Sequence, residues 1–198
     1  MDKAANDLVA NYFRHSVSTM ERAAGDDKLH RAIRTMADLI ETIFSSGNKL
    51  MIAGNGGSAA DAQHVAGEFL SRLNFDRAPL PAIALSTDTS VLTAIGNDYG
   101  FEHVFERQIR GLGNRGDGLL AISTSGRSPN ILAALRAARE LGITTMGFTG
   151  AEGGSMKSLC DVCLFAPSQE TPLIQQIHVT AAHVVCTLVE HSMFGKRA

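Results

Sequence analysis

Short apolar runs alternate along the chain with longer segments in which apolar residues recur every three or four positions. The short runs, bounded by turn residues, predict buried strands, and the longer periodic segments predict helices. Because strands alternate with helices, the pattern predicts an α/β fold, a parallel sheet with helices on both faces. Strands are expected at residues 50–53, 82–85, 119–122, 144–148 and 162–166, and helices at 59–69, 90–95, 101–109, 130–141, 155–159 and from 172 to about 193. A polar turn at 86–89 is expected to cap the helix at 90–95, and 96–100 is expected to be a tight loop.

Two further helices precede the first predicted strand and form a helical hairpin. The first covers residues 2–24 and ends at Gly25, and the second covers 27–44 and ends at the Ser-Gly-Asn sequence of 46–48. Both helices carry an apolar stripe, which in the first includes Tyr12 and Phe13. Such a stripe must be buried, so we expect the hairpin to pack either on the rest of the chain or on another subunit.

Length and charge narrow the class of protein. At 198 residues the chain has the size of one domain, with the hairpin at 1–46 and an α/β core at 47–198. Its net charge of −2 gives no reason to expect binding to nucleic acid or to an anionic membrane. No uninterrupted apolar run approaches the about 18 residues needed to span a bilayer, and the amino terminus lacks the basic-then-apolar order of a signal peptide.

The cysteines favour a reducing compartment. The chain has three of them, an odd number and too few for a disulfide scaffold. Cys160 and Cys163 form a CxxC sequence, but neither a second CxxC nor a nearby histidine completes a zinc site. We interpret them as small apolar residues and expect a cytoplasmic protein.

A glycine-rich segment, GNGG at 54–57, connects the first strand to a helix. Backbone N–H groups and the positive end of the helix dipole make such a junction an anion site, although the same loop can also be only a tight connection. Ser58 is expected to be the N-cap, with Asp61 completing a capping box. His64 and Glu68 lie at i and i+4, so they share one face, either as functional groups or as a surface pair.

A second polar segment follows the third strand. Four of its residues carry hydroxyl groups, Pro129 suits the first turn of the next helix, and Ser128 suits the N-cap. Such a loop fits the phosphate of a small molecule, or it only caps the helix. There is no Walker lysine, so no nucleotide cofactor is expected. Because both loops follow strands of one parallel sheet, they should face a common crevice; the hydroxyl residues are Ser123, Thr124, Ser125 and Ser128.

Four segments occur in an order typical of one known family. They are GNGGSAADAQHVAGEF, AIGNDYGFEHVFERQI, LLAISTSGRSPN and TPLIQQIHVTAAHVV, and together they resemble the sugar isomerase (SIS) domain family, most closely its bacterial phosphoheptose isomerases. The resemblance covers nearly the whole chain. It implies a single SIS domain, a Rossmann- or flavodoxin-like three-layer sandwich with a five-stranded parallel sheet.

The resemblance also implies an activity. It is the conversion of sedoheptulose 7-phosphate to D-glycero-D-manno-heptose 7-phosphate through an ene-diol. This would be the first step toward nucleotide-activated heptose for lipopolysaccharide or capsule. Family members are homotetramers with active sites between subunits, and some hold one zinc ion per subunit.

Site residues follow from the matching positions. The catalytic acid/base pair falls on Glu68 and His183. The zinc ligands fall on His64, Glu68, Gln175 and His183. The phosphate-binding positions are Ser123, Thr124, Ser125 and Ser128, and the other substrate-binding positions are Asn55, Gly56, Gly57, Ser58, Glu68, Arg72, Asn97, Asp98 and Gln175.

Two mechanisms stay open. Glu68 can be a free base that removes a proton next to the carbonyl, with His183 as proton shuttle, or Glu68 can bind zinc. Gln175 and His183 are eight residues apart, about 12 Å along a continuous helix. One ion then reaches both only from between them, unless the helix is distorted or the two come from different subunits. His178 and His191 are interpreted as core or surface residues.

Three rival functions fit parts of the same pattern. One is a non-enzymatic SIS-domain tetramer that binds a replication initiator, but the presence of both Glu68 and His183 favours the enzyme. A phosphosugar-sensing regulator would need a DNA-binding helix-turn-helix, for which 198 residues leave no room. An isomerase of another phosphosugar is the third.

Overall fold

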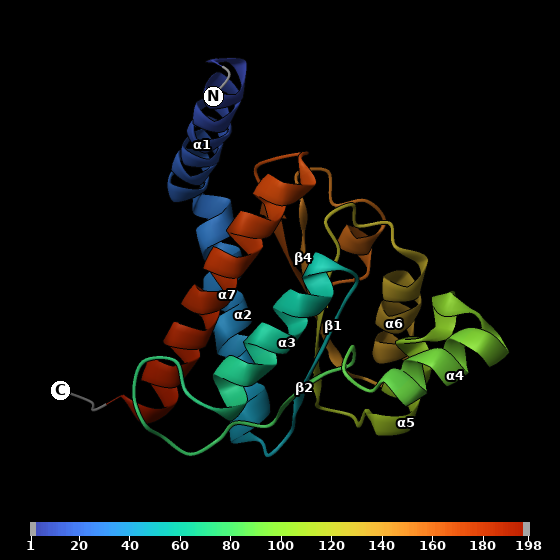
Figure 1. Cartoon of the computed structure of the whole chain (residues 1–198). Coiled ribbons are helices and arrows are strands. Elements are labelled where there is room, and N and C mark those ends of the chain that lie inside the picture. Colours follow the sequence, from blue (N-terminus) through green and yellow to red (C-terminus); the bar gives the residue numbers. More distant parts are fainter. Residues whose placement is uncertain (1–2, 196–198) are drawn as a thin grey trace.

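The computed structural model describes residues 3–195, which form a five-stranded parallel sheet enclosed by helices (Figure 1). The strand order is β2-β1-β3-β4-β5, and every neighbouring pair is parallel. The predicted sheet is therefore confirmed. Its strands are β1 (Leu50–Gly54), β2 (Ala82–Ala84), β3 (Gly118–Ile122), β4 (Thr144–Gly150) and β5 (Val162–Ala166).

Helices cover both faces of this sheet. The long helices α2 (Asp27–Ser45), α3 (Gly57–Leu70) and α7 (Thr171–Phe194) lie on one side, with α1 (Lys3–Ala24) projecting beyond them (Figure 1). The other side holds α4 (Thr89–Tyr99), α5 (Glu106–Leu112), α6 (Pro129–Glu140) and two short 3₁₀ segments, η1 (Phe101–His103) and η2 (Met156–Ser158). The expected first residue of the hairpin, Asp2, and the expected domain limits at 1 and 198 lie outside the described residues.

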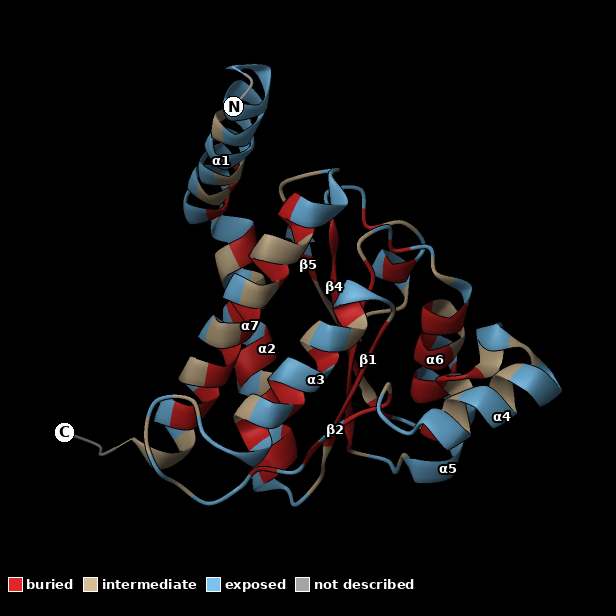
Figure 2. Ribbon diagram, in the orientation of Figure 1, coloured by how far each residue is buried: buried red, intermediate tan, exposed pale blue. Residues whose placement is uncertain are grey.

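Two apolar clusters form the core, one on each face of the sheet. Side chains alternate along a strand, so Leu50 and Ile52 of β1 join the cluster with α2, α3 and α7. Met51 and Ala53 point the other way and pack with α5 and α6. The central strands β1 and β3 are accordingly buried throughout and β4 is buried beyond its first residue, whereas the edge strands β2 and β5 are exposed at Ile83 and Phe165 (Figure 2). These two clusters make the molecule the expected three-layer sandwich.

The hairpin is only partly buried within one chain. α2 packs on the sheet and on α7, whereas α1 buries only Thr19 and Ala23 among its described residues (Figure 2). Its apolar stripe is open, and Phe13 is 68% exposed. The stripe consists of Leu8, Val9, Tyr12, Phe13 and Val17.

The segment 96–100, expected to be a tight loop, is mostly helical. Asp88 caps α4 by accepting a hydrogen bond from the Val91 backbone N–H at 3.0 Å, as the polar turn predicted. Once started, the helix continues through Asn97 and Asp98, because extending a helix costs less than starting one. It ends at Gly100, whose φ of +94° suits glycine alone. The expected helix 101–109 is divided into η1 and α5.

α7 is long and apolar enough to cross a membrane, the one helix of the described chain that is. Half of its most apolar window is buried against the rest of the protein, including Ile177, Ala181 and Val185 in the core cluster. This burial is the behaviour of a core helix. The cysteines are free, and the thiols of Cys160 and Cys163 both lie beside Gly147 of β4.

Candidate active site

The turn after β1 places the amino terminus of α3 at the carboxyl edge of the sheet. A side chain at Gly54 would collide with the backbone of Ser58, so only glycine allows this tight approach. Gly56, with φ of +56°, occupies the N-cap position. The expected capping box is therefore wrong, because the helix already begins at Gly57 and Ser58 lies buried in its first turn.

Asp61, the other half of that expected box, faces inward instead. One of its carboxylate oxygens is buried and has no hydrogen-bond partner among the described residues. Burial raises the pKa of Asp61 above its usual value, and the nearby His64 partly opposes the shift. Asp61 thus lies beside the cluster described next without capping the helix.

His64, Glu68 and His183 converge from two neighbouring helices. α3 supplies His64 and Glu68, whose Nε2 and Oε1 atoms are 3.2 Å apart. α7 supplies His183, whose Nε2 lies 2.8 Å from Nε2 of His64. The predicted i, i+4 pair therefore has a third member from 119 residues further along the chain. We call these three residues the His–Glu–His cluster.

The cluster has the donor set of a metal site. One ligand atom from each residue lies within 4.8 Å of the other two. Two imidazoles and a carboxylate are typical protein ligands of catalytic zinc, which keeps a fourth position open. Partial exposure, 47% for the His64 side chain and 17% for Glu68, leaves that position accessible. The residues therefore fit the expected ion.

Gln175 lies on the same helix as His183 but nearer the glycine loop. A side chain at Gly57 would collide with the Gln175 amide, so this amide rests on the first residue of α3. α7 is continuous from Thr171 to Phe194, which excludes a distorted helix between Gln175 and His183. Within one chain, an ion shared by both would have to lie between them.

The hydroxyl loop after β3 has the expected helix start. Ser128 is the N-cap of α6 and Pro129 its first residue, as predicted, but the Ser128 side chain caps no backbone N–H. Its Oγ lies 3.0 Å from Oγ of Ser123 instead, so the Ser128 hydroxyl does not cap the start of α6. A cavity of about 200 Å³ adjoins the loop and is lined by Thr124, Ser125, Arg127, Gly150 and Ser168 among others.

Asn130 was not predicted to belong to the site. Its amide exchanges two hydrogen bonds, both of 2.9 Å, with the amide of Asn55 in the glycine loop. It also accepts the backbone N–H of Ile131 and is 2% exposed. This reciprocal pair joins the glycine loop to the hydroxyl loop, as the crevice prediction requires. A buried asparagine directly after a Ser-Pro helix start was the available signal.

The remaining predicted residues form no hydrogen bond or ion pair with the cluster within the described part of the chain. Arg72 is exposed just after the carboxyl end of α3. Asn97 and Asp98 hydrogen-bond each other at 2.8 Å on α4, which lies across the sheet from α7 (Figure 1). α4 buries none of its residues within this chain. One subunit therefore brings together the cluster and both loops but not these three side chains.

Comparison with known proteins places the chain in a family. The SIS domain model matches residues 11–150. A phosphoheptose isomerase from Bradyrhizobium sp. (strain BTAi1 / ATCC BAA-1182) is 58% identical over 193 residues, 98% of each chain. One from Burkholderia pseudomallei (strain K96243) is 54% identical over 189 residues, 96% of each chain.

A solved structure agrees with these similarities. The phosphoheptose isomerase from Neisseria gonorrhoeae superposes with a TM-score of 0.88 at 40% identity, covering 94% of this chain and 98% of that one. The chain therefore belongs to the SIS domain family and, within it, to the group of phosphoheptose isomerases.

Proposed function

We propose that the protein is a phosphoheptose isomerase that converts sedoheptulose 7-phosphate to D-glycero-D-manno-heptose 7-phosphate. The observation that carries the proposal is the His–Glu–His cluster, in which His64 and Glu68 of α3, the helix that follows the glycine loop, meet His183 of α7. The identity of 58% to a phosphoheptose isomerase over nearly the whole chain supports the substrate. The product would enter the synthesis of nucleotide-activated heptose for lipopolysaccharide or capsule.

The reaction moves one proton between neighbouring carbons and one between their oxygens. The Glu68 carboxylate removes a proton from C1 of the ketose, which gives the ene-diol, and returns it to C2. His183 moves the hydroxyl proton from O1 to O2, since its imidazole can donate and accept near neutral pH. The carbonyl thereby passes from C2 to C1 with no net gain or loss of atoms.

Zinc is the proposed cofactor. His64, Glu68 and His183 would hold it, with Gln175 as a fourth ligand from the amino-terminal side of the cluster. When bound, the ion would supply a Lewis acid that stabilises negative charge on the substrate oxygens. A Glu68 bound to metal is a weaker base, so the metal-bound and metal-free roles compete.

Both loops would bind the substrate. The phosphate is assigned to the hydroxyl loop, where the hydroxyl groups and the positive end of the α6 dipole favour an anion. Gln175 and the start of α3 would hold the sugar. The proposed phosphate ligands are Ser123, Thr124, Ser125 and Ser128, and the proposed sugar ligands are Asn55, Gly56, Gly57, Ser58, Glu68 and Gln175.

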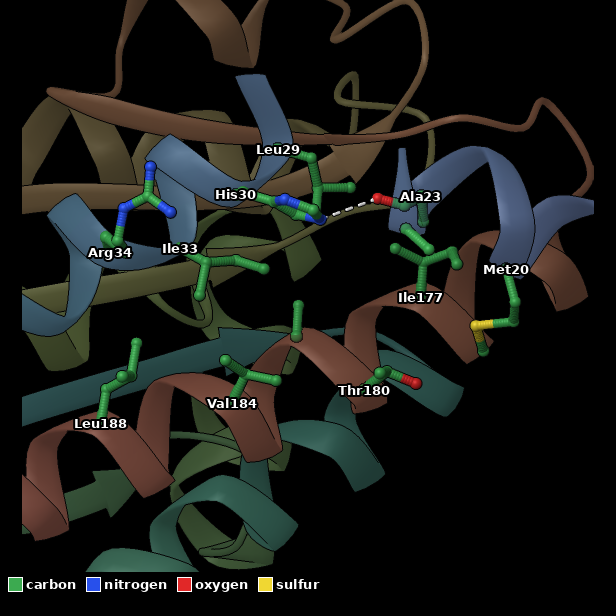
Figure 3. Close-up of a pocket in the computed structure, with 12 residues that line it drawn as sticks. Met20, Ala23, Leu29, His30, Ile33, Arg34, Ile177, Thr180, Val184 and Leu188 are labelled. Atoms are coloured by element: carbon green, nitrogen blue, oxygen red, sulfur yellow. Dashed lines mark hydrogen bonds between the residues drawn. The ribbon is translucent and has the colours of Figure 1, made fainter. Parts of the chain in front are cut away.

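We assign Arg72, Asn97 and Asp98 to the active site of a neighbouring subunit in a homotetramer. The open stripe of α1 supports such an assembly, as does an apolar groove of about 550 Å³ between α2 and α7 (Figure 3). His30 stabilises the joint between α1 and α2 through a 3.0 Å hydrogen bond to the Ala23 carbonyl (Figure 3). The apolar lining includes Met20, Leu29, Ile33, Ile177, Val184 and Leu188.

The proposed enzyme is cytoplasmic and needs neither a membrane nor nucleic acid. The net charge of −2 supports this, as does the half-buried position of α7 in the core. Of the rival functions, the initiator-binding tetramer would not need the His–Glu–His cluster. An isomerase of another phosphosugar would use the same cluster and loops. Only a comparison of turnover on different substrates distinguishes it from the proposed enzyme.

The test is turnover of sedoheptulose 7-phosphate by the purified protein, followed by proton NMR, before and after chelation. We expect conversion to the aldose, loss on chelation and recovery with added zinc. Activity that persists after chelation would assign Glu68 as a free base. Faster turnover of a shorter ketose phosphate would replace sedoheptulose 7-phosphate as the proposed substrate. A folded protein that binds the phosphosugar but does not convert it in any metal condition would overturn the proposal that the protein is an enzyme.

A further inference from the structure

The segment between α3 and β2 is held by an ion pair whose two side chains are buried. Nε of Arg77 lies 3.0 Å from Oε1 of Glu190, and the two side chains are only 2% and 1% exposed. Buried charges are costly unless every polar atom is paired. Neither residue belongs to the predicted site, and both lie outside the cluster and the two loops.

Glu190 comes from α7 and binds the segment that follows α3. Its carboxylate accepts the backbone N–H groups of Leu73 and Asn74 at 3.1 and 2.8 Å. The Asn74 side-chain amide adds a third hydrogen bond of 2.9 Å. These bonds, together with Arg77, hold the carboxylate ionised, and the pKa of Glu190 is below its usual value although burial alone would raise it.

Arg77 caps the carboxyl end of α3. Its guanidinium donates to the backbone carbonyls of Glu68 and Phe69, each at 2.7 Å. A further hydrogen bond of 3.0 Å reaches the Ala78 carbonyl. The last carbonyls of a helix have no intrahelical partner, and a cation there also interacts favourably with the helix dipole.

Both ends of this ion pair are connected to the proposed catalytic residues. Arg77 holds the main chain of Glu68 itself. Glu190 follows His183 by seven residues, about two helical turns, so the two side chains project from the same face of α7. The ion pair thus fixes how far α3 and α7 can slide along each other, which small apolar side chains such as Ala66, Ala181 and Ala182 would not prevent alone.

We propose that Arg77 and Glu190 are positioning residues that set the register of α3 against α7 and so bring His64 and Glu68 to His183. The effect on catalysis rests on the proposed function, whereas the effect on the geometry of the cluster does not. The test therefore measures both the geometry of the cluster and the catalytic rate, on the full chain.

The test variant is Glu190→Gln, and the chain offers a matched control in Asp117→Asn. Asp117 is 2% exposed, pairs with Lys49 at 2.6 Å and accepts the backbone N–H groups of Lys49 and Asn114 at 3.0 and 2.8 Å. It precedes β3, at the edge of the sheet opposite the site. Both substitutions remove one buried charge at nearly constant volume, but only one lies between α3 and α7.

The first readout is the nitrogen NMR spectrum of the imidazoles. We expect Glu190→Gln to shift the His64 and His183 signals, because the hydrogen bond between their rings is lost, and Asp117→Asn to leave them in place. The second readout is turnover, for which a small displacement of catalytic groups predicts a loss of kcat on the order of 100-fold in Glu190→Gln with little change in KM.

Unshifted imidazole signals in a folded Glu190→Gln protein would overturn the proposal, whatever the activity. Equal shifts in both variants would also overturn it, since they would reflect stability alone. Shifted signals in a protein whose wild type does not turn over substrate would instead overturn the proposed function and keep the positioning role. If Glu190→Gln does not fold, Arg77→Lys replaces it, because lysine keeps the charge and loses the fork that reaches Glu68 and Phe69.

Discussion

His64 and His183 face each other with ring nitrogens 2.8 Å apart, and this distance restricts their protonation. One Nε2 must donate and the other accept, because two protonated nitrogens would repel at that distance. The carboxylate of Glu68 lies 3.2 Å from the same nitrogen of His64. At the scale of single residues, the cluster is therefore arranged either to relay one proton or to bind a metal ion that displaces that proton into solvent.

His178 lies five residues before His183 on α7 and has the opposite environment. It is 1% exposed, and its Nε2–H donates to the Thr149 carbonyl at 3.2 Å. Burial lowers the pKa of His178 to about 4. Of the two predicted alternatives for His178, a core or a surface residue, the core alternative is confirmed. His178 stays neutral, whereas the proposed mechanism requires His183 to exchange protons.

The buried His178 should make unfolding depend on pH. Its pKa rises from about 4 in the folded state to 6.5 in the unfolded state, so the unfolded state binds the extra proton between these values. We expect the free energy of unfolding to fall as the pH drops from 6.5 to 4, with His178 contributing up to about 3 kcal/mol. His178→Gln should flatten the curve in this window, as measured by urea unfolding at fixed protein concentration.

The exposed His191, on the same helix, supplies the control. His191→Gln should keep the wild-type slope. Identical slopes for His178→Gln and wild type would contradict the assignment of a neutral, buried His178.

The sequence predicted part of this residue-scale picture. Spacing alone placed His64 and Glu68 on one face of a helix, and that is confirmed. The capping role of Asp61 was wrong, because the helix begins two residues earlier than expected, at Gly57, after a tight backbone approach at Gly54. The reciprocal amides of Asn55 and Asn130 depend on how two loops meet, which no local pattern contains.

Between elements, the loops after β3 and β4 fit together through glycines. A side chain at Gly126 would collide with the carbonyl of Gly153, and Gly126 has a positive φ of +62°. The Met156 backbone N–H also donates to the Gly126 carbonyl at 3.1 Å. The shape of the hydroxyl loop is therefore held from outside by the loop that follows β4.

Gly126→Ala should disturb this fit and weaken phosphosugar binding. We expect the dissociation constant for sedoheptulose 7-phosphate to rise about tenfold, equivalent to about 1.4 kcal/mol, because the hydroxyl loop must move away from Gly153. Calorimetric titration measures the change without requiring turnover.

Gly47→Ala is the matched control, since Gly47 also has a positive φ of +77° but has no atom in the way of a side chain. Both variants should lose about 1 kcal/mol of stability from backbone strain. Equal affinities in the two variants would contradict a binding role for the hydroxyl loop.

The elements themselves were largely predictable. All five strands are confirmed within two residues of their expected ends, because apolar runs bounded by turn residues are a local signal. The prediction of a tight loop at 96–100 was wrong, because glycine and asparagine are typical of turns but here the helix continues through them. The direction in which α1 projects could not be predicted, since it depends on what covers its stripe.

At the scale of the whole molecule, α1 is a long helix of 22 residues that buries only two of them, Thr19 and Ala23. It presents its apolar stripe to solvent, while the groove between α2 and α7 offers an apolar surface nearby (Figure 3). The sequence left open whether the hairpin packs on its own domain or on another subunit. α2 packs on its own domain, and the open face of α1 is the basis for proposing that α1 packs on another subunit.

Phe13→Asp should therefore weaken assembly. A charge at this 68% exposed position would have to be buried in a subunit interface, which is costly without a partner. We expect a smaller mass by light scattering coupled to size-exclusion chromatography, and loss of turnover together with the mass. Ser18→Asp, which adds the same charge on the opposite side of α1, should leave the mass unchanged; an unchanged mass in both variants would remove α1 from the proposed interface.

The central claim is that Glu68 exchanges the proton that isomerises a phosphosugar. The most direct measurement compares wild type with Glu68→Gln on sedoheptulose 7-phosphate in deuterated water, by NMR. Wild type should form the aldose and incorporate solvent deuterium next to the carbonyl. Folded Glu68→Gln should do so at a rate that is lower by a factor of about 10² to 10⁴. Wild-type rates in Glu68→Gln, or no exchange in a wild-type protein that binds the substrate, would contradict the account.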